Sequence, residues 1–264
     1  MFKGFGTKYP EYEVITPQTK LSFTIRTLNV QDEERLKASL LTPIKVTDHL
    51  NKCLFEALVN KPEQVKDFKS FLKTITLKDR EALLYGLYHI TYEEIRNYDV
   101  KCSNSNCRKE YPVTIKASET FSFNPYPEED ILSKRIKVEL PKTPNVSVVL
   151  KQPSLDDESE VLKNLSGSLG YSIDVIIETL IIDKFEQDIE AQVAPVEIND
   201  RREIIDAYRT LAAKDKRTIH ERYLEEFGKY SIDLKMKSFC KFCGNEDVIT
   251  IDLVENFFRM VYSS

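Results

Sequence analysis

Cys240-Lys241-Phe242-Cys243-Gly244 is the stretch from which the fold of this chain can be deduced. It holds two cysteines separated by two residues, followed by a glycine that permits a tight turn. This is the pattern of a zinc knuckle. A second pair, Cys102 and Cys107, flanks the four residues Ser103-Asn104-Ser105-Asn106. That wider spacing still lies within the range found for zinc ligands.

Neither pair can complete a metal site alone, because structural zinc takes four ligands. We therefore expect Cys102, Cys107, Cys240 and Cys243 to hold one Zn²⁺ jointly. Four thiolates leave no open coordination position, so the metal is expected to be structural and not catalytic. The alternative is a set of free thiols on hairpin turns. The fifth cysteine, Cys53, falls on the apolar side of a predicted helix and is expected to be a buried, inert thiol.

The sequences around the two pairs indicate β-hairpins. Strand-like runs, Tyr98–Lys101 and Ile232–Lys235, precede them, and alternating runs, Tyr111–Ile115 and Asp247–Ile251, follow. Period-two alternation on both sides of a tight turn is typical of a hairpin. A redox role for Cys240 and Cys243 would need a helix after the motif, as in thioredoxin-like folds, whereas strand-like sequence follows here.

Further outward, the chain looks internally duplicated. In each half an extended stretch runs into an acidic helix start, then an apolar helix, then a second helix, then the cysteine hairpin. The matching segments are Phe23–Arg26 and Val148–Lys151; Val30–Glu33 and Leu155–Glu158; helices Asp48–Val59 and Ile173–Phe185; helix starts Leu77–Arg80 and Ile198–Arg201. The second copy has a longer helical extension, to about Phe227.

We predict an α+β fold with two pseudo-repeated subdomains, each combining helices with a small antiparallel sheet and a zinc-ribbon-like hairpin. The predicted boundaries are an N-terminal arm at 1–17, a first repeat at 18–117, a proline-containing linker at 118–144 and a second repeat at 145–264. The linker assignment rests on the prolines between Ser118 and Asn145.

Composition excludes several classes of protein. The net charge is −5, with basic and acidic residues interspersed, whereas a nucleic-acid binder would usually show a basic stripe. Seven glycines provide no phosphate-binding loop, and the three histidines are scattered. No apolar run approaches the length of a membrane span, and no signal sequence is evident, so we expect a chain made and kept in a cytosol.

The first half resembles the T-even-type bacteriophage baseplate hub family and related myophage tail proteins. The likeness covers roughly Phe2 to Ile115 and fades in the second half. It is carried by an ordered series of segments: Gly4–Pro10, Phe23–Leu28, Leu77–Leu84 with Ile90–Tyr92, and Tyr98–Cys102 with Val113–Ile115. Lys116 stands where an acidic residue would be usual; Asp252 keeps that character in the second copy.

The resemblance implies a non-enzymatic component of the central baseplate, located in the virion tail and assembled in the host cytoplasm. Its partners would be other phage baseplate and tail proteins, with no small-molecule substrate, no membrane and no nucleic acid. Two alternatives stay open: an assembly chaperone absent from the mature virion, and a zinc-ribbon nucleic-acid-binding protein. We expect the aromatic-rich ends, Phe2–Tyr12 and Phe257–Tyr262, to contact partners or to pack on the protein's own core.

Overall fold

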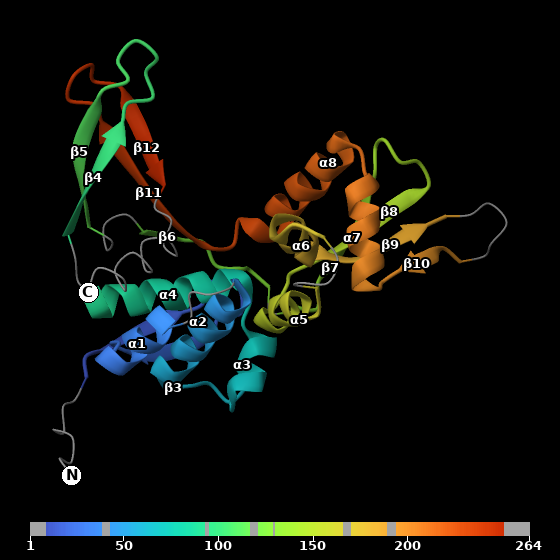
Figure 1. The fold of residues 1–264 in the computed structure, drawn as a ribbon, viewed down its shortest axis with the longest axis horizontal. Coiled ribbons are helices and arrows are strands. Elements are labelled where there is room, and N and C mark those ends of the chain that lie inside the picture. The colour runs from blue at the N-terminus through green and yellow to red at the C-terminus, as the bar shows by residue number, and fades with distance from the viewer. Residues whose placement is uncertain are drawn as a thin grey trace.

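The computed structural model describes residues 9–38, 43–92, 95–116, 121–128, 130–165, 170–188 and 194–250. Helices pack on several small antiparallel sheets, so the predicted α+β class is confirmed (Figure 1). Within these ranges, no helix is long and apolar enough to cross a membrane. Most of both aromatic ends, including Phe257–Tyr262, lies outside the described residues.

The first half begins with a three-stranded sheet in the order β1-β2-β3, covered by helices, and ends in a hairpin. Its elements are β1 (Glu11–Ile15), β2 (Ser22–Arg26), α1 (Val30–Ala38), α2 (Pro43–Ala57), β3 (Leu58–Asn60), α3 (Phe68–Thr74), α4 (Leu77–Tyr92), β4 (Ile95–Lys101) and β5 (Glu110–Lys116).

The second half is built on a four-stranded sheet in the order β10-β9-β8-β7 and also ends in a hairpin. Its elements are β6 (Phe121–Phe123), β7 (Arg135–Glu139), β8 (Val146–Lys151), α5 (Leu155–Leu165), α6 (Ile173–Glu178), a 3₁₀ turn (Thr179–Ile181), β9 (Ile182–Gln187), β10 (Val196–Ile198), α7 (Arg201–Thr210), α8 (Ala213–Tyr223), a π-helical turn (Leu224–Gly228), β11 (Ile232–Phe239) and β12 (Glu246–Thr250).

Each half has its own hydrophobic core. In the first, Phe23 and Ile25 alternate on β2 and are fully buried in one cluster with residues of α4. Gly86 lets α4 approach β1 closely, because a Cβ at this position would lie 2.2 Å from Cγ2 of Val14. In the second, Val148 of β8 lies in a cluster with residues of β9 and α7.

A polar seam joins the two halves. The side chain of Gln18 donates to Oε1 of Gln152 at 3.4 Å and to the carbonyl oxygen of Phe227 at 3.1 Å. Tyr223 donates to the same Gln152 oxygen at 3.0 Å. Close by, Arg80 of α4 forms a two-bond ion pair with Glu158 of α5. Since buried polar groups need partners, these bonds fix how the halves sit together.

Two of the predicted helices end earlier than expected. The segment Ile173–Phe185 is helical only to Ile181, and β9 begins at Ile182. The helix predicted at Asp48–Val59 instead spans Pro43–Ala57 and is followed at once by β3. Both errors have one cause, since a short apolar run does not distinguish a buried helix from a buried strand.

The segments predicted as arm and linker contain regular structure. β1 lies inside the predicted arm 1–17 and pairs with β2 through the register Tyr12 to Ile25. β6 and β7 lie inside the predicted linker 118–144, where they pair with β11 and β8. The prolines of this stretch fall between the strands, so the segment adds an edge strand to each of two sheets.

Candidate metal centre

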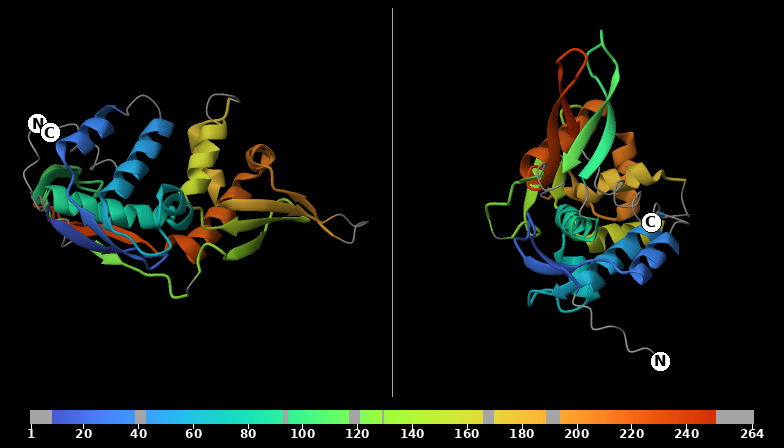
Figure 2. Two further views of the ribbon diagram at one scale, coloured as in Figure 1. Left: turned by 90° about the horizontal axis from the view of Figure 1, so that it is seen from below. Right: turned by 90° about the vertical axis from the view of Figure 1, so that its left-hand side faces the viewer.

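The hairpins β4–β5 and β11–β12 lie side by side and project together from the helical body (Figures 1 and 2). Each cysteine pair sits at the tip of its hairpin. There, the backbone N–H of Cys102 donates to the carbonyl of Lys109 at 3.0 Å, and that of Cys240 donates to the carbonyl of Asn245 at 2.9 Å. The last ladder contact is therefore the same in both hairpins, although their loops differ in length.

The two turns are closed by different local hydrogen bonds. In the first, the side chain of Asn104 accepts from the N–H of Asn106 at 2.9 Å, and its carbonyl accepts from the N–H of Cys107 at 2.9 Å. This Asx turn absorbs the longer gap. In both turns the residue after the second cysteine is left-handed, with φ of 48° at Arg108 and 71° at Gly244.

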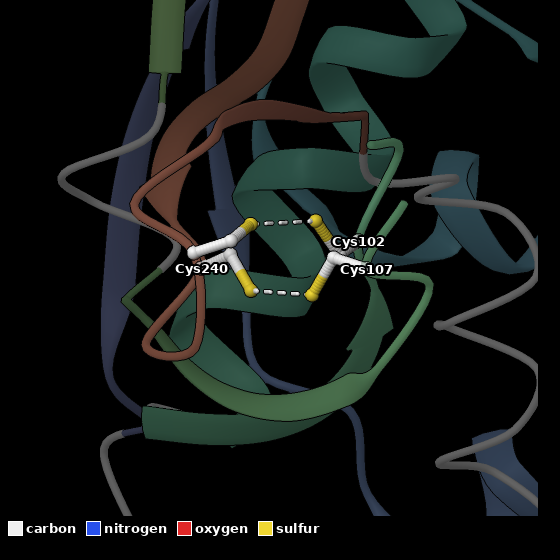
Figure 3. Close-up of side chains that lie close together, drawn as sticks. Cys102, Cys107 and Cys240 are labelled. Atoms are coloured by element: carbon white, nitrogen blue, oxygen red, sulfur yellow. Dashed lines mark hydrogen bonds between the residues drawn. The ribbon is translucent and has the colours of Figure 1, made fainter. Parts of the chain in front are cut away.

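The four predicted ligands come together at these tips. Their Sγ atoms all lie within 4.8 Å of one another. Sγ of Cys102 lies 3.6 Å from that of Cys243, and Sγ of Cys107 lies 3.8 Å from that of Cys240 (Figure 3). A tetrahedral ion with metal–sulfur bonds of about 2.3 Å separates its ligands by about 3.8 Å, so the cluster has the size that zinc requires.

The backbone around the sulfurs is arranged to stabilise thiolates. Burial raises the pKa of Cys240, but the N–H groups of Phe242 and Cys243 donate to its sulfur and bring the pKa down to about 7. At Cys102, burial dominates and raises the pKa to about 12. A bound dication would reverse that effect, because a coordinating thiol is deprotonated outright. The amide donors would then offset the charge of a four-thiolate site.

A small core lies beneath the cysteines and joins the two hairpins. Tyr111 and Val113 of β5 are buried beside Cys102 and Cys240, with Met236 packed against them. Strand alternation produces this core, since it turns every second residue of each hairpin inward.

Asp247 of β12 connects this core to the first hairpin by hydrogen bonds. Its Oδ1 accepts from the backbone N–H of Ser103 at 3.0 Å and from the Ser103 hydroxyl at 2.5 Å. Its Oδ2 accepts from the hydroxyl of Tyr111 at 2.8 Å. These bonds, those from Ser103 above all, lower the pKa of Asp247 to about 2. The buried carboxylate therefore couples the two hairpins in addition to the cysteines.

Sequence reasoning identified the four cysteines but missed Asp247, Tyr111 and Ser103. Their signal is weak, because each matters only through contacts more than a hundred residues away in the chain. Cys53 takes no part in the cluster. It is buried in α2, and its burial raises the thiol pKa to about 12, in agreement with an inert thiol.

The outer face of the second hairpin carries exposed apolar side chains. Phe239, Phe242 and Val248 are 64%, 49% and 61% exposed. Lys109 of the first hairpin and Lys241 of the second lie over the ring of Phe242, at 4.7 and 5.2 Å from its centroid. This face combines exposed aromatic area with positive charge.

In a comparison with known families, residues 9–259 match the family model described as T4 bacteriophage base plate protein. The match spans nearly the whole chain, including both hairpins and all four clustered cysteines. No significant match was found among curated proteins or among solved structures.

Proposed function

The chain belongs to the T4 bacteriophage base plate protein family, and we propose that it is a structural component of the central hub region of the baseplate. It acts by protein–protein contacts, and a zinc ion staples its two halves. The observation that carries this proposal is the convergence of two cysteine pairs from the ends of the two halves into a cluster of tetrahedral size.

The cluster suits a structural role better than a catalytic one. A catalytic zinc keeps one position open for water or substrate, whereas four thiolates occupy all four positions. The neighbouring carboxylate, Asp247, is already engaged by Ser103 and Tyr111. It is therefore not poised as a general base, which supports a protein without enzymatic activity.

Metal analysis of the full chain purified without chelator tests the zinc assignment. We expect about one zinc per chain. Cys240→Ser should lose the metal, and the matched Cys53→Ser should keep it, since Cys53 lies outside the cluster. Zinc absent from the wild-type protein, or retained in full by Cys240→Ser, would contradict the proposal.

Treatment with a chelator distinguishes a metal that only links the two halves from a metal that supports the whole fold. Removing zinc should raise hydrogen exchange in β4, β5, β11 and β12 first, because those strands converge on the cysteines. The sheets β1-β2-β3 and β7-β8-β9 have their own buried cores and should stay protected. Simultaneous loss of protection in all sheets would mean that the metal supports the whole fold.

The main alternative is a baseplate assembly chaperone that leaves before the virion matures. Quantitative mass spectrometry of purified phage particles and of infected-cell extracts distinguishes the two roles. A structural component is recovered in particles at a fixed ratio to other baseplate proteins. A chaperone is abundant in extracts and missing from particles.

The second alternative, a zinc-ribbon nucleic-acid binder, has less support from the charges on the hairpins. Nζ of Lys235 lies 2.5 Å from Oδ2 of Asp233, and Nζ of Lys237 lies 2.8 Å from Oε1 of Glu246. Both lysines are therefore already paired with carboxylates. We expect no more than weak, salt-sensitive binding to duplex DNA. Tight binding that survives physiological salt would favour this alternative.

A further inference from the structure

The nearest sulfur neighbours in the cluster come from opposite hairpins. Cys102 faces Cys243 at 3.6 Å, and Cys107 faces Cys240 at 3.8 Å (Figure 3). Because a disulfide needs its sulfurs at about 2.05 Å, each sulfur would move by less than about 1 Å.

Each of these pairs also combines an accessible sulfur with a buried one. Cys243 is exposed and Cys107 is half-buried, whereas their partners Cys102 and Cys240 are both buried. An oxidant in solution therefore reaches one member of each pair first. The other member is held beside it, shielded from further oxidation.

We propose that the cluster is also an oxidation site, at which a two-electron oxidant of the peroxide class forms the disulfides Cys102–Cys243 and Cys107–Cys240. This inference rests on the proposed function in one respect: the oxidised form replaces the metal as the link between the hairpins. The chain thus has two ways to keep its halves joined, one metal-bound and one disulfide-bonded.

The chemistry balances with peroxide as the only added reactant. The accessible thiolate attacks one peroxide oxygen, the O–O bond breaks, and a sulfenic acid and hydroxide form. The facing thiolate then attacks that sulfur, the S–S bond forms, and a second hydroxide leaves. In forming each disulfide, the two thiolates together give up two electrons to one peroxide. Two peroxides therefore oxidise all four thiolates, and the zinc ion is released as Zn²⁺ without changing its charge.

The two forms suit two environments. Thiols stay reduced in a cytosol, where the metal-bound form persists, whereas disulfides persist on virions outside the cell. A tail component passes from the first environment to the second. Disulfides within each knuckle would leave the hairpins joined only by the contacts of Asp247 and the small core beneath the cysteines, whereas disulfides between the hairpins preserve a bonded link.

Peptide mapping of the full-length wild-type protein tests the pairing directly. Protein is treated with hydrogen peroxide, both as purified and after zinc removal, then alkylated and digested with trypsin. Cleavage separates Cys240 (peptide 238–241) from Cys243 (peptide 242–259) and leaves Cys102 and Cys107 together (peptide 102–108). We expect one species linking all three peptides, and fragmentation between Cys102 and Cys107 should assign the two bonds.

The control is internal. Cys53 is buried in another part of the fold, so its peptide (53–66) should remain in the alkylated thiol form. In Cys243→Ser, the Cys107–Cys240 bond alone should form. For protein that contains zinc, release measured with a colorimetric chelator should follow disulfide formation, at about one zinc per two peroxides.

The outcomes separate this inference from the zinc proposal. A closed 102–108 peptide together with a 238–241/242–259 pair would overturn the inference, as would chains linked only to other chains or cysteines oxidised beyond the disulfide. If the protein holds no zinc yet forms both bonds between hairpins, the zinc proposal fails and the oxidation site stands.

Discussion

The two halves of the chain follow nearly the same order of elements. Each has two antiparallel strands, two helices, a third strand on the same sheet, a further helix and a cysteine hairpin. They differ in two places: after the third strand, the first half inserts α3 and the second adds β10, and before the hairpin the second half alone adds α8 and the π-helical turn. We propose that the halves arose by duplication. On that view, the sheet and hairpin are the repeated unit, and the segments between them are free to change.

The starts of α1 and α5 show what such a repeat conserves physically. In α1, Asp32 and Asn29 exchange side-chain-to-backbone bonds, and Asp32 pairs with Arg26 at 2.8 Å. In α5, Asp157 and Ser154 exchange the same bonds, and Asp157 pairs with Lys151 at 2.5 Å. The spacing of the three residues is identical in both. The residues are chemical equivalents, so the helix start is kept while the sequence changes.

The two knuckles differ more. Gly244 adopts its left-handed conformation without strain, whereas Arg108 adopts the same conformation with a side chain. The longer first loop compensates through the Asn104 turn. A shared geometry at the metal centre is thus reached from unlike sequences.

Breaking the junction between the halves should have the largest effect on stability. Arg80 and Glu158 are 16% and 9% exposed at their side chains, so Arg80→Met leaves a buried carboxylate without its partner. We expect the free energy of unfolding to fall by about 3 to 5 kcal/mol. Urea denaturation measures it. In the matched control, Arg217→Met, the ion pair with Glu221 is exposed and the midpoint should not move. A junction variant as stable as wild type would mean that the halves do not depend on this pair.

The sequence predicted local elements of the fold but not the contacts at this junction between the halves. The starts of α4 and α7 and the hairpin strands follow from caps and alternation, which are local signals. The seam formed by Gln18, Gln152 and Tyr223 could not be predicted, because isolated polar residues carry no sign that they will be buried together. Burial there depends on how two separate cores dock.

Contacts between distant parts of the chain also limited what could be predicted for the metal centre and for the strand β9. The cysteine spacing predicted the ligands, and a ligand count predicted their meeting. The strand β9 was missed because the apolar residues of Ile173–Phe185 also fit a buried helix, and only sheet pairing with β8 decides the conformation of the last residues. Asp247 was missed because a carboxylate in an alternating strand is expected to face solvent.

The second-largest expected effect is the pH dependence of the unfolding free energy that Asp79 causes. Burial raises the pKa of Asp79, at the start of α4, to about 6, although hydrogen bonds from Gln18, Thr19 and Thr76 act in the opposite direction. A carboxyl whose pKa is raised in the folded state stabilises the fold fully below its unfolded pKa near 4 and loses that contribution as the pH rises through 6.

The unfolding free energy of wild type should therefore fall, relative to that of Asp79→Asn, by about 2 kcal/mol between pH 4 and pH 7. Denaturation curves at several pH values give the difference. Equal pH profiles for wild type and Asp79→Asn would contradict the prediction.

Substitutions at the two knuckles should have opposite signs. A Cβ at Gly244 meets nothing within 4 Å, so Gly244→Ala tests backbone conformation alone and should destabilise the hairpins by about 1 to 2 kcal/mol. Arg108→Gly removes the same strain and should stabilise them by about 1 kcal/mol. The zinc affinity of each variant, measured by competition with a chelator, reports both changes. Effects of the same sign would mean that the two turns are not equivalent.

The smallest expected effects test the duplication itself. Asn29→Ala and Ser154→Ala each remove the side-chain oxygen that accepts from the N–H of the acidic residue three positions on, at 3.0 and 3.2 Å. Loss of such a cap costs about 1 kcal/mol, and the two losses should be similar because the surrounding ion pairs are also alike. Asn29→Ser and Ser154→Asn exchange the two caps and should each retain most of the stability, since either side chain can accept the bond. If the exchanged caps lower the stability as much as alanine does, each helix start is adapted to its own half. The two caps are then not interchangeable, although the hydrogen bonds that they form are alike.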